Sequence, residues 1–118
     1  TVFMDLQTAE QALVTQTLPQ YETDTTFMNR LRQGQPPVPG QVTSLLLALK
    51  TVQDGLQGAV VLNRVLAHSL FLLTYESRNL FEAGRAAGIN WPPLLDEDFE
   101  RIAITAYKIF IDAPVEDE

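Results

Sequence analysis

Five side chains between positions 64 and 82 are of types that could recognise or process a small molecule. They are Arg64, His68, Tyr75, Arg78 and Glu82. At 100° per residue these positions fall within about 80° of arc on an α-helix, so one helix would present them as a single polar seam. Arginine binds a carboxylate through paired hydrogen bonds, and histidine exchanges protons near neutral pH. The seam therefore supports a helical bundle with a small-molecule or lipid-binding cavity lined by Arg64, His68 and Tyr75.

The same polar seam has a second interpretation, as the narrow solvent-facing strip of an otherwise buried helix. Most other residues in the first half of this segment are apolar, which is typical of a helix at the centre of a bundle. Arg64 would then face water or pair with an acidic residue of another helix. The sequence favours this second interpretation over a cavity, and both stay open.

The only histidine, His68, lacks the neighbours that catalysis or metal binding requires. A catalytic histidine needs a nucleophile and an orienting carboxylate, and the chain has no Gly-x-Ser-x-Gly motif. The Glu-x-x-His spacing of di-iron bundles is missing because Val65 stands three residues before His68. Cysteine is absent too, which removes thiolate nucleophiles and cysteine-ligated metals. We therefore expect no enzymatic activity, no metal and no cofactor.

The charge balance bears on which partners the chain can bind. Its formal net charge is −7, and an acidic chain repels the phosphates of nucleic acids and of anionic membranes unless its cations cluster. The eight lysine and arginine residues are instead scattered. The longest apolar stretch, residues 59–73, is too short to span a bilayer and is interrupted by Asn63, Arg64 and His68. Neither nucleic-acid binding nor transmembrane insertion is expected.

The lack of cysteine also bears on the cellular compartment. Small secreted proteins often depend on disulfides, so a cysteine-free chain favours a reducing interior, and we expect a cytoplasmic protein. The sequence begins at Thr1 rather than at methionine, so removal of an upstream signal segment stays open.

Apolar residues recur at helical spacing along nearly the whole chain, and no stretch shows the alternation typical of strands. This pattern predicts a single all-α domain over residues 1–118, built as a compact bundle of three main helices plus one or two short N-terminal helices. We expect the short helices within residues 1–34, a proline-rich connector over 35–40, the helical core over 41–113 and an acidic tail over 114–118.

Local motifs predict where the short N-terminal helices begin and end. Thr8 and Gln11 have the form of a capping box for the first helix, and Pro19 ends it. Asp24 is expected to cap a second helix, which Gly34 terminates.

The same kind of signal sets the expected bounds of the later helices. A long helix is predicted from about Ala59 to Ala87, with Gly88 as its stop. Asp96 is expected to be the N-cap of the last helix, which Pro114 stops.

The last helix carries more apolar residues than one packed neighbour requires. Its core face is extended around the helix by Ile104, Tyr107 and Ile111 into a wide apolar arc. An apolar arc of this width is typical of surface buried against another subunit. Leu47 similarly stands off the apolar stripe of its own helix. We therefore predict a protein that acts through protein–protein interaction, as a homodimer or with another protein. The alternative is that the short N-terminal helices fold over these positions.

The single tryptophan lies in a rigid corner, because two prolines follow Trp91 directly. A tryptophan on a rigid loop can anchor an interface, in this case at the rim of the apolar stripe. It can equally close the end of the bundle, and the sequence does not decide between these roles.

Overall fold

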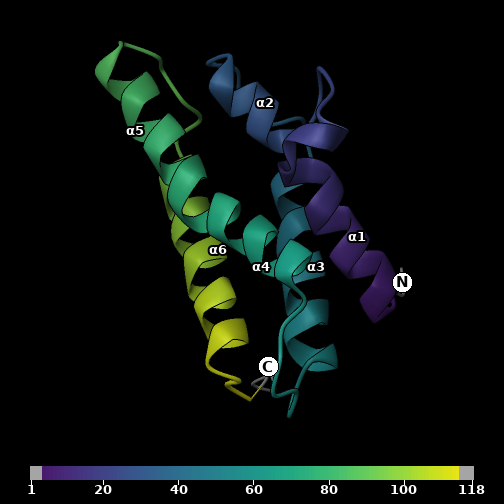
Figure 1. Ribbon diagram of the computed structural model, residues 1–118. Coiled ribbons are helices and arrows are strands. Elements are labelled where there is room, and N and C mark those ends of the chain that lie inside the picture. Colours follow the sequence, from purple (N-terminus) through teal and green to yellow (C-terminus); the bar gives the residue numbers. More distant parts are fainter. Residues whose placement is uncertain (1–3, 115–118) are drawn as a thin grey trace.

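Helices occupy most of residues 4–114, the part of the chain that the computed structural model describes (Figure 1). No strand occurs within those residues, which confirms the all-α prediction. Of the predicted acidic tail, residues 115–118 lie outside this part of the chain. In chain order the elements are α1 (Leu6–Thr17), the 3-10 turn η1 (Pro19–Tyr21), α2 (Phe27–Arg32), α3 (Gln41–Gly55), α4 (Arg64–Phe71), the π-helical turn η2 (Leu72–Glu76), α5 (Ser77–Ala86) and α6 (Leu95–Phe110).

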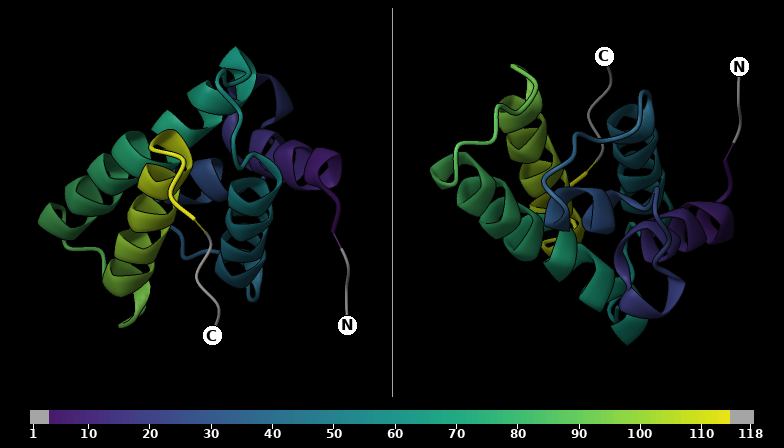
Figure 2. Two further views of the ribbon diagram at one scale, coloured as in Figure 1. Left: turned by 90° about the horizontal axis from the view of Figure 1, so that it is seen from below. Right: turned by 90° about the horizontal axis from the view of Figure 1, so that it is seen from above.

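The helices pack as a bundle in which α3 and α6 lie side by side and run in the same direction (Figures 1 and 2). Hydrogen bonds join the C-terminal end of α3 and the loop after it to the segment after α6, from Gln53 Nε2 to the Ala113 carbonyl (3.1 Å) and from the Gly58 amide to Asp112 Oδ1 (3.0 Å). α1 packs against α3 and α4, and α2 packs against α5. Each of five helices contributes fully buried side chains to the core, among them Leu13, Phe27, Leu49, Leu70 and Ile102.

The first helix begins earlier than its predicted capping box. Asp5 is the N-cap of α1, and its Oδ1 accepts a hydrogen bond from the Thr8 amide at 2.8 Å. This bond lowers the pKa of Asp5, because it favours the ionised carboxylate. Thr8 and Gln11 lie inside the helix, and the Gln11 amide instead donates to Thr15 Oγ1. The predicted box was therefore wrong by one turn.

The second helix takes its cap from another part of the chain. Asp24 is exposed, and α2 begins only at Phe27. The Phe27 amide donates to Gln16 Oε1 of α1 at 2.9 Å, which supplies the acceptor that a local cap would provide. The prediction of Asp24 as the cap was wrong because this partner lies eleven residues away in sequence. Gly34, with φ of 73°, ends the helix as predicted.

The predicted long helix is present but starts five residues later than expected. α4, η2 and α5 form one continuous helix from Arg64 to Ala86. Asn63 caps it, since its Oδ1 accepts from the Val65 amide at 2.7 Å. Val60 and Val61 precede this cap and are 96% and 81% exposed, so they do not extend the helix into the core. The Asn63 side chain favours a helix start at this position. The run of apolar residues on both sides of Asn63 does not show that start.

Inside the long helix, η2 winds as a π-helical turn, which no local motif in the sequence predicts. A turn of this kind accommodates an extra residue within an α-helix. Hydroxyl groups bond the backbone on both sides of it: Thr74 Oγ1 donates to the Leu70 carbonyl at 3.0 Å, and the Ser77 hydroxyl donates to the Leu73 carbonyl. α6 makes its close backbone approach to the long helix at this turn.

The last helix differs from its prediction at both ends. Asp96 lies inside the first turn of α6, and Leu94 occupies the N-cap without a side-chain cap bond. Negative charge in the first turn is still favourable, because the helix dipole is positive there. The helix ends at Phe110, four residues before Pro114, and Asp112 then takes a left-handed conformation with φ of 57°. The chain therefore turns before the proline is reached.

Candidate functional site

The polar seam predicted from the sequence lies on the outer side of the long helix. Arg64, His68 and Tyr75 are all exposed, as expected for a solvent-facing strip. Among residues 4–114 no acidic side chain forms an ion pair with Arg64. The exposure of these side chains argues against a cavity that the three residues would line together.

The other two seam residues link α5 to α6. Arg78 Nη1 lies 2.6 Å from Asp96 Oδ1 and 3.5 Å from Glu82 Oε2. The guanidinium also lies 5.5 Å from the ring centroids of Phe81 and Phe99, within the range of cation–π attraction. The hydrogen bond from Arg78 lowers the pKa of Asp96, because it favours the charged carboxylate. Arg78 and Glu82 therefore have structural partners that account for their positions.

Two aromatic rings stack on the surface between the ends of the seam. The centroids of Phe71 and Tyr75 are 5.2 Å apart with 26° between the ring planes. Both rings are more than half exposed. Phe71 directly precedes η2 and Tyr75 lies within it, where α6 approaches the long helix. Their spacing of four residues on a helix was the available signal, and Phe71 was not among the predicted site residues.

Trp91 closes one end of the bundle rather than standing at the rim of an interface. It is only 8% exposed. Its Nε1 donates to the Phe81 carbonyl at 3.0 Å, and the two rings are 5.8 Å apart. Gly84 lies against the indole, in a space that a Cβ would fill. Of the two roles that the sequence left open for Trp91, this packing favours closing the bundle over a place at an interface, because it leaves almost none of the ring accessible.

The apolar residues predicted on the last helix are on the surface. Ile104, Tyr107 and Ile111, which we call the α6 outer face, are 50%, 62% and 51% exposed. Phe110 at the end of the helix is about half exposed as well. The N-terminal helix does not cover them, because α1 packs against α3 and α4. Figure 2 shows α6 at the edge of the bundle, between α3 and the long helix.

Leu47, the remaining predicted interface residue, is also exposed but belongs to a different surface. It lies on α3. Gln53 marks the side of α3 that contacts the segment after α6, and Leu47 is about 120° from Gln53 around the helix. We therefore do not include Leu47 in the α6 outer face.

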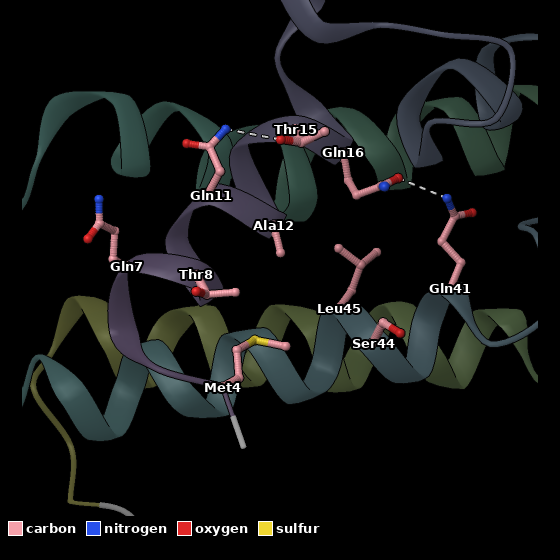
Figure 3. A pocket seen from close by; sticks show the side chains of 10 residues that line it. All are labelled: Met4, Gln7, Thr8, Gln11, Ala12, Thr15, Gln16, Gln41, Ser44 and Leu45. Carbon is pink, nitrogen blue, oxygen red and sulfur yellow. Dashed lines mark hydrogen bonds between the residues drawn. The ribbon is translucent and has the colours of Figure 1, made fainter. Parts of the chain in front are cut away.

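A groove that the sequence did not predict runs between α1 and α3 (Figure 3). Its volume is about 660 Å³, and none of the residues that line it is charged. Met4, Ala12 and Leu45 contribute apolar surface, while glutamine, threonine and serine side chains supply amides and hydroxyls. The groove joins residues about thirty positions apart in sequence, so no single helical pattern reveals it.

Some of the polar side chains that line this groove form hydrogen bonds between helices. Gln41 Nε2 donates to Gln16 Oε1 at 2.8 Å and to the Thr25 carbonyl at 2.9 Å. The same Gln16 oxygen accepts the amide that caps α2. These bonds close one end of the groove, as Figure 3 shows for the two glutamines.

Within residues 4–114, no three histidine, aspartate or glutamate side chains gather closely enough to hold a metal ion. In that same part of the chain, no helix combines the length and the apolar character needed to cross a bilayer. Comparisons of the chain with protein-family models, with curated proteins and with solved structures give no match.

Proposed function

We propose that this protein is not an enzyme and acts through protein–protein contact, associating with a second copy of itself through the α6 outer face. The observation that carries the proposal is the exposure of Ile104 and Tyr107 on α6 and of Ile111, the C-cap residue of the same helix. Isolated exposed apolar residues are ordinary, whereas a contiguous apolar stripe on a small domain is typical of a contact surface.

The amount of apolar surface sets the expected strength of this association. Full burial of a large apolar side chain contributes about 1.5–3 kcal/mol. The three residues are each about half exposed, so burying them on two copies would contribute about 5–9 kcal/mol. Lost translational and rotational freedom costs about 4 kcal/mol or more. We therefore expect a reversible dimer that dissociates on dilution, with a dissociation constant of about 0.2 mM or weaker.

Sedimentation velocity over a dilution series from millimolar to micromolar chain tests the proposal. The average mass should rise towards that of two chains with concentration, and Tyr107→Glu should hold the chain as a monomer, because a carboxylate would be buried without a partner. Leu47→Glu is the matched control, since it adds the same charge at another exposed apolar position and should leave dimerisation nearly unchanged. A wild-type chain that stays monomeric at every concentration, and that Tyr107→Glu does not alter, would remove the proposal.

The groove between α1 and α3 supports a second candidate function, the binding of an uncharged small molecule. An apolar floor with amides and hydroxyls around it, and no charged side chain, suits a neutral ligand that forms hydrogen bonds. A fragment screen followed by amide NMR shifts would test this, with Ser44→Trp filling the groove. Compounds bearing a carboxylate are the control. If those bind instead, and Arg64→Ala abolishes their binding, the ligand site is the polar seam and not the groove.

A further inference from the structure

The connection between α3 and α4 carries small aliphatic side chains that face solvent. We call residues 59–62 the exposed segment. Within it, Val60 and Val61 are 96% and 81% exposed. Leu47 and Ile104, by comparison, are 43% and 50% exposed and lie in helices. The exposed segment therefore combines apolar side chains with a backbone that no helix encloses.

The backbone of the exposed segment is also open to a partner. Its path from the lower end of α3 to the start of α4 does not coil (Figure 1). Within residues 4–114, the amides of Val60, Val61 and Leu62 donate to no other backbone group, and their carbonyls accept from none. Asn63, which follows, has extended backbone angles, with φ of −60° and ψ of 131°. Amides and carbonyls of this kind can pair with another protein as an added strand.

Both ends of the exposed segment are fixed to the bundle. Before it, the Gly58 amide donates to Asp112 Oδ1 at 3.0 Å, and Gln57 Nε2 donates to the Ala113 carbonyl at 2.8 Å. After it, the Asn63 side chain caps α4. No atom of the exposed segment takes part in these bonds, so a break within the segment leaves all of them in place.

We infer that the exposed segment is a processing site, at which an endopeptidase specific for small aliphatic residues cuts the chain and leaves the bundle assembled. Such an enzyme holds its substrate as an extended strand and admits a small apolar side chain beside the bond that it breaks. The net reaction is hydrolysis of one peptide bond, for example that between Val60 and Val61. Water supplies a hydroxyl to the Val60 carbonyl carbon and a proton to the Val61 nitrogen as the C–N bond breaks.

Leu47 and Ile104 do not offer the same enzyme a site, because they lie in helices. A helix must open locally before an extended binding cleft can hold it, and cleavage then proceeds only from the small population of open molecules. We therefore expect cleavage in the exposed segment to be at least about 10-fold faster than at any other site within residues 4–114.

The cut chain should remain assembled, because each piece supplies part of one core. A cut in the exposed segment leaves α1, α2 and α3 on one piece and α4, α5 and α6 on the other. α1 packs against α4 and α3 packs against α6, so the two pieces share the core. The bonds from Gln57 and Gly58 to the segment after α6 also join them. Cleavage therefore turns a fold of one chain into a complex of two, whose stability falls on dilution.

Limited digestion of the full chain with pancreatic elastase tests the site, because the specificity pocket of this enzyme is small. Mass spectrometry of the fragments should show that the first cut within residues 4–114 follows Ala59, Val60 or Val61. A first cut in a helix, at Leu47 or Ile104, would overturn the inference, because it would mean that exposure of the side chain alone decides where the enzyme acts.

Trypsin, which cuts after lysine and arginine, measures access to the backbone separately. All eight of these residues lie in helices: Arg30, Arg32, Lys50, Arg64, Arg78, Arg85, Arg101 and Lys108. Val60→Arg adds a ninth in the exposed segment, and trypsin should cut there at least about 10-fold faster than at the natural sites. Leu47→Arg is the matched control, because it adds the same charge at an exposed position of α3 and should create no fast cut. Equal cleavage at the two introduced arginines would contradict the inference.

Gel filtration of the elastase-cut protein tests whether the bundle stays assembled. At micromolar concentration the two pieces should elute together at the volume of the intact chain. In urea, the unfolding midpoint of the cut protein should fall with dilution and that of the intact chain should not, because only the cut protein separates into two chains. Pieces that separate in gel filtration would overturn the inference. Self-association through the α6 outer face is measured on the uncut chain, so the two proposals fail or stand independently.

Discussion

Replacing Gly84 by alanine would place a methyl group where the Trp91 ring already lies. An added Cβ would be 2.6 Å from Cζ2 and 3.0 Å from Cε2 of the indole, whereas carbon atoms in contact are ordinarily about 3.5–4.0 Å apart. The ring has little freedom to retreat, because it packs on Phe81 and its Nε1 donates to the Phe81 carbonyl. Either the indole or α5 must therefore move.

Two opposing effects decide the magnitude for Gly84→Ala. Alanine favours the helix over glycine by about 1 kcal/mol. Overpacking a filled site costs about 1–3 kcal/mol, and loss of the hydrogen bond between Trp91 and Phe81 costs about 0.5–1.5 kcal/mol more. The steric cost exceeds the gain in helix propensity. We therefore expect Gly84→Ala to lower the free energy of unfolding by about 1–3 kcal/mol.

Urea unfolding followed by circular dichroism and fluorescence measures this change. Trp91 is the only tryptophan, so the native emission spectrum should also shift as the indole is displaced. Ala83→Gly, at an exposed position of the same helix, is the control for helix propensity alone and should cost about 1 kcal/mol. It should leave the native emission unchanged.

Measuring Gly84→Ala in a second variant chain separates the steric contact with Trp91 from the difference in helix propensity between glycine and alanine. In a Trp91→Ala chain the steric conflict is gone, so Gly84→Ala should there raise the free energy of unfolding by about 1 kcal/mol. A stabilising effect of Gly84→Ala in the wild-type chain would refute the reasoning, because it would mean that the indole yields to the methyl group at no cost.

Three further substitutions test other contacts. Thr17→Val should lower the free energy of unfolding by about 1–3 kcal/mol in urea, because it leaves the buried Ser69 hydroxyl without the Thr17 oxygen that lies 2.7 Å away; adding Ser69→Ala should recover part of the loss. Arg78→Gln should raise the pKa of Asp96, measured by carboxyl NMR. The stability that this pair provides is present above the ordinary carboxyl pKa and is lost as the pH falls through the lowered one. Asn63→Ala should cost about 1 kcal/mol, read by thermal melting, because it removes the cap of α4.

The helical class and the exposure of the α6 outer face could be predicted because both follow from the period of a single helix. Tyr107 and Ile104 lie away from the core face by position alone, and their exposure confirms it. The arrangement of Arg78 with Asp96 could not be predicted in this way. In the sequence, Arg78 belongs to the polar seam and Asp96 to the start of the last helix. Only the packing of α5 against α6 brings Arg78 Nη1 to 2.6 Å from Asp96 Oδ1.

Helix ends were predicted less well, because acceptors outside the local sequence compete with local caps. The amide at the start of α2 is satisfied by Gln16 rather than by Asp24. The groove between α1 and α3 escaped prediction for a related reason, since its two walls belong to separate helices. The corner at Trp91 had two equal interpretations, and the contact with Gly84 decides between them. That contact had a sequence signal, a glycine inside an otherwise helical pattern.

The π-helical turn at η2 fixes the rotational phase between the two halves of the long helix. A π-helical turn holds about one residue more than an α-helical turn for nearly the same rotation, whereas each residue of a regular α-helix advances it by about 100°. Rewinding η2 as a regular α-helix with all its residues kept would therefore rotate α4 by about 100° relative to α5. Ser69 and Leu70, both fully buried, would then be carried away from the core. Deleting one residue within 72–76 would instead let a regular helix close with its two halves nearly in phase. The winding of η2 thus decides which side chains of α4 face the core.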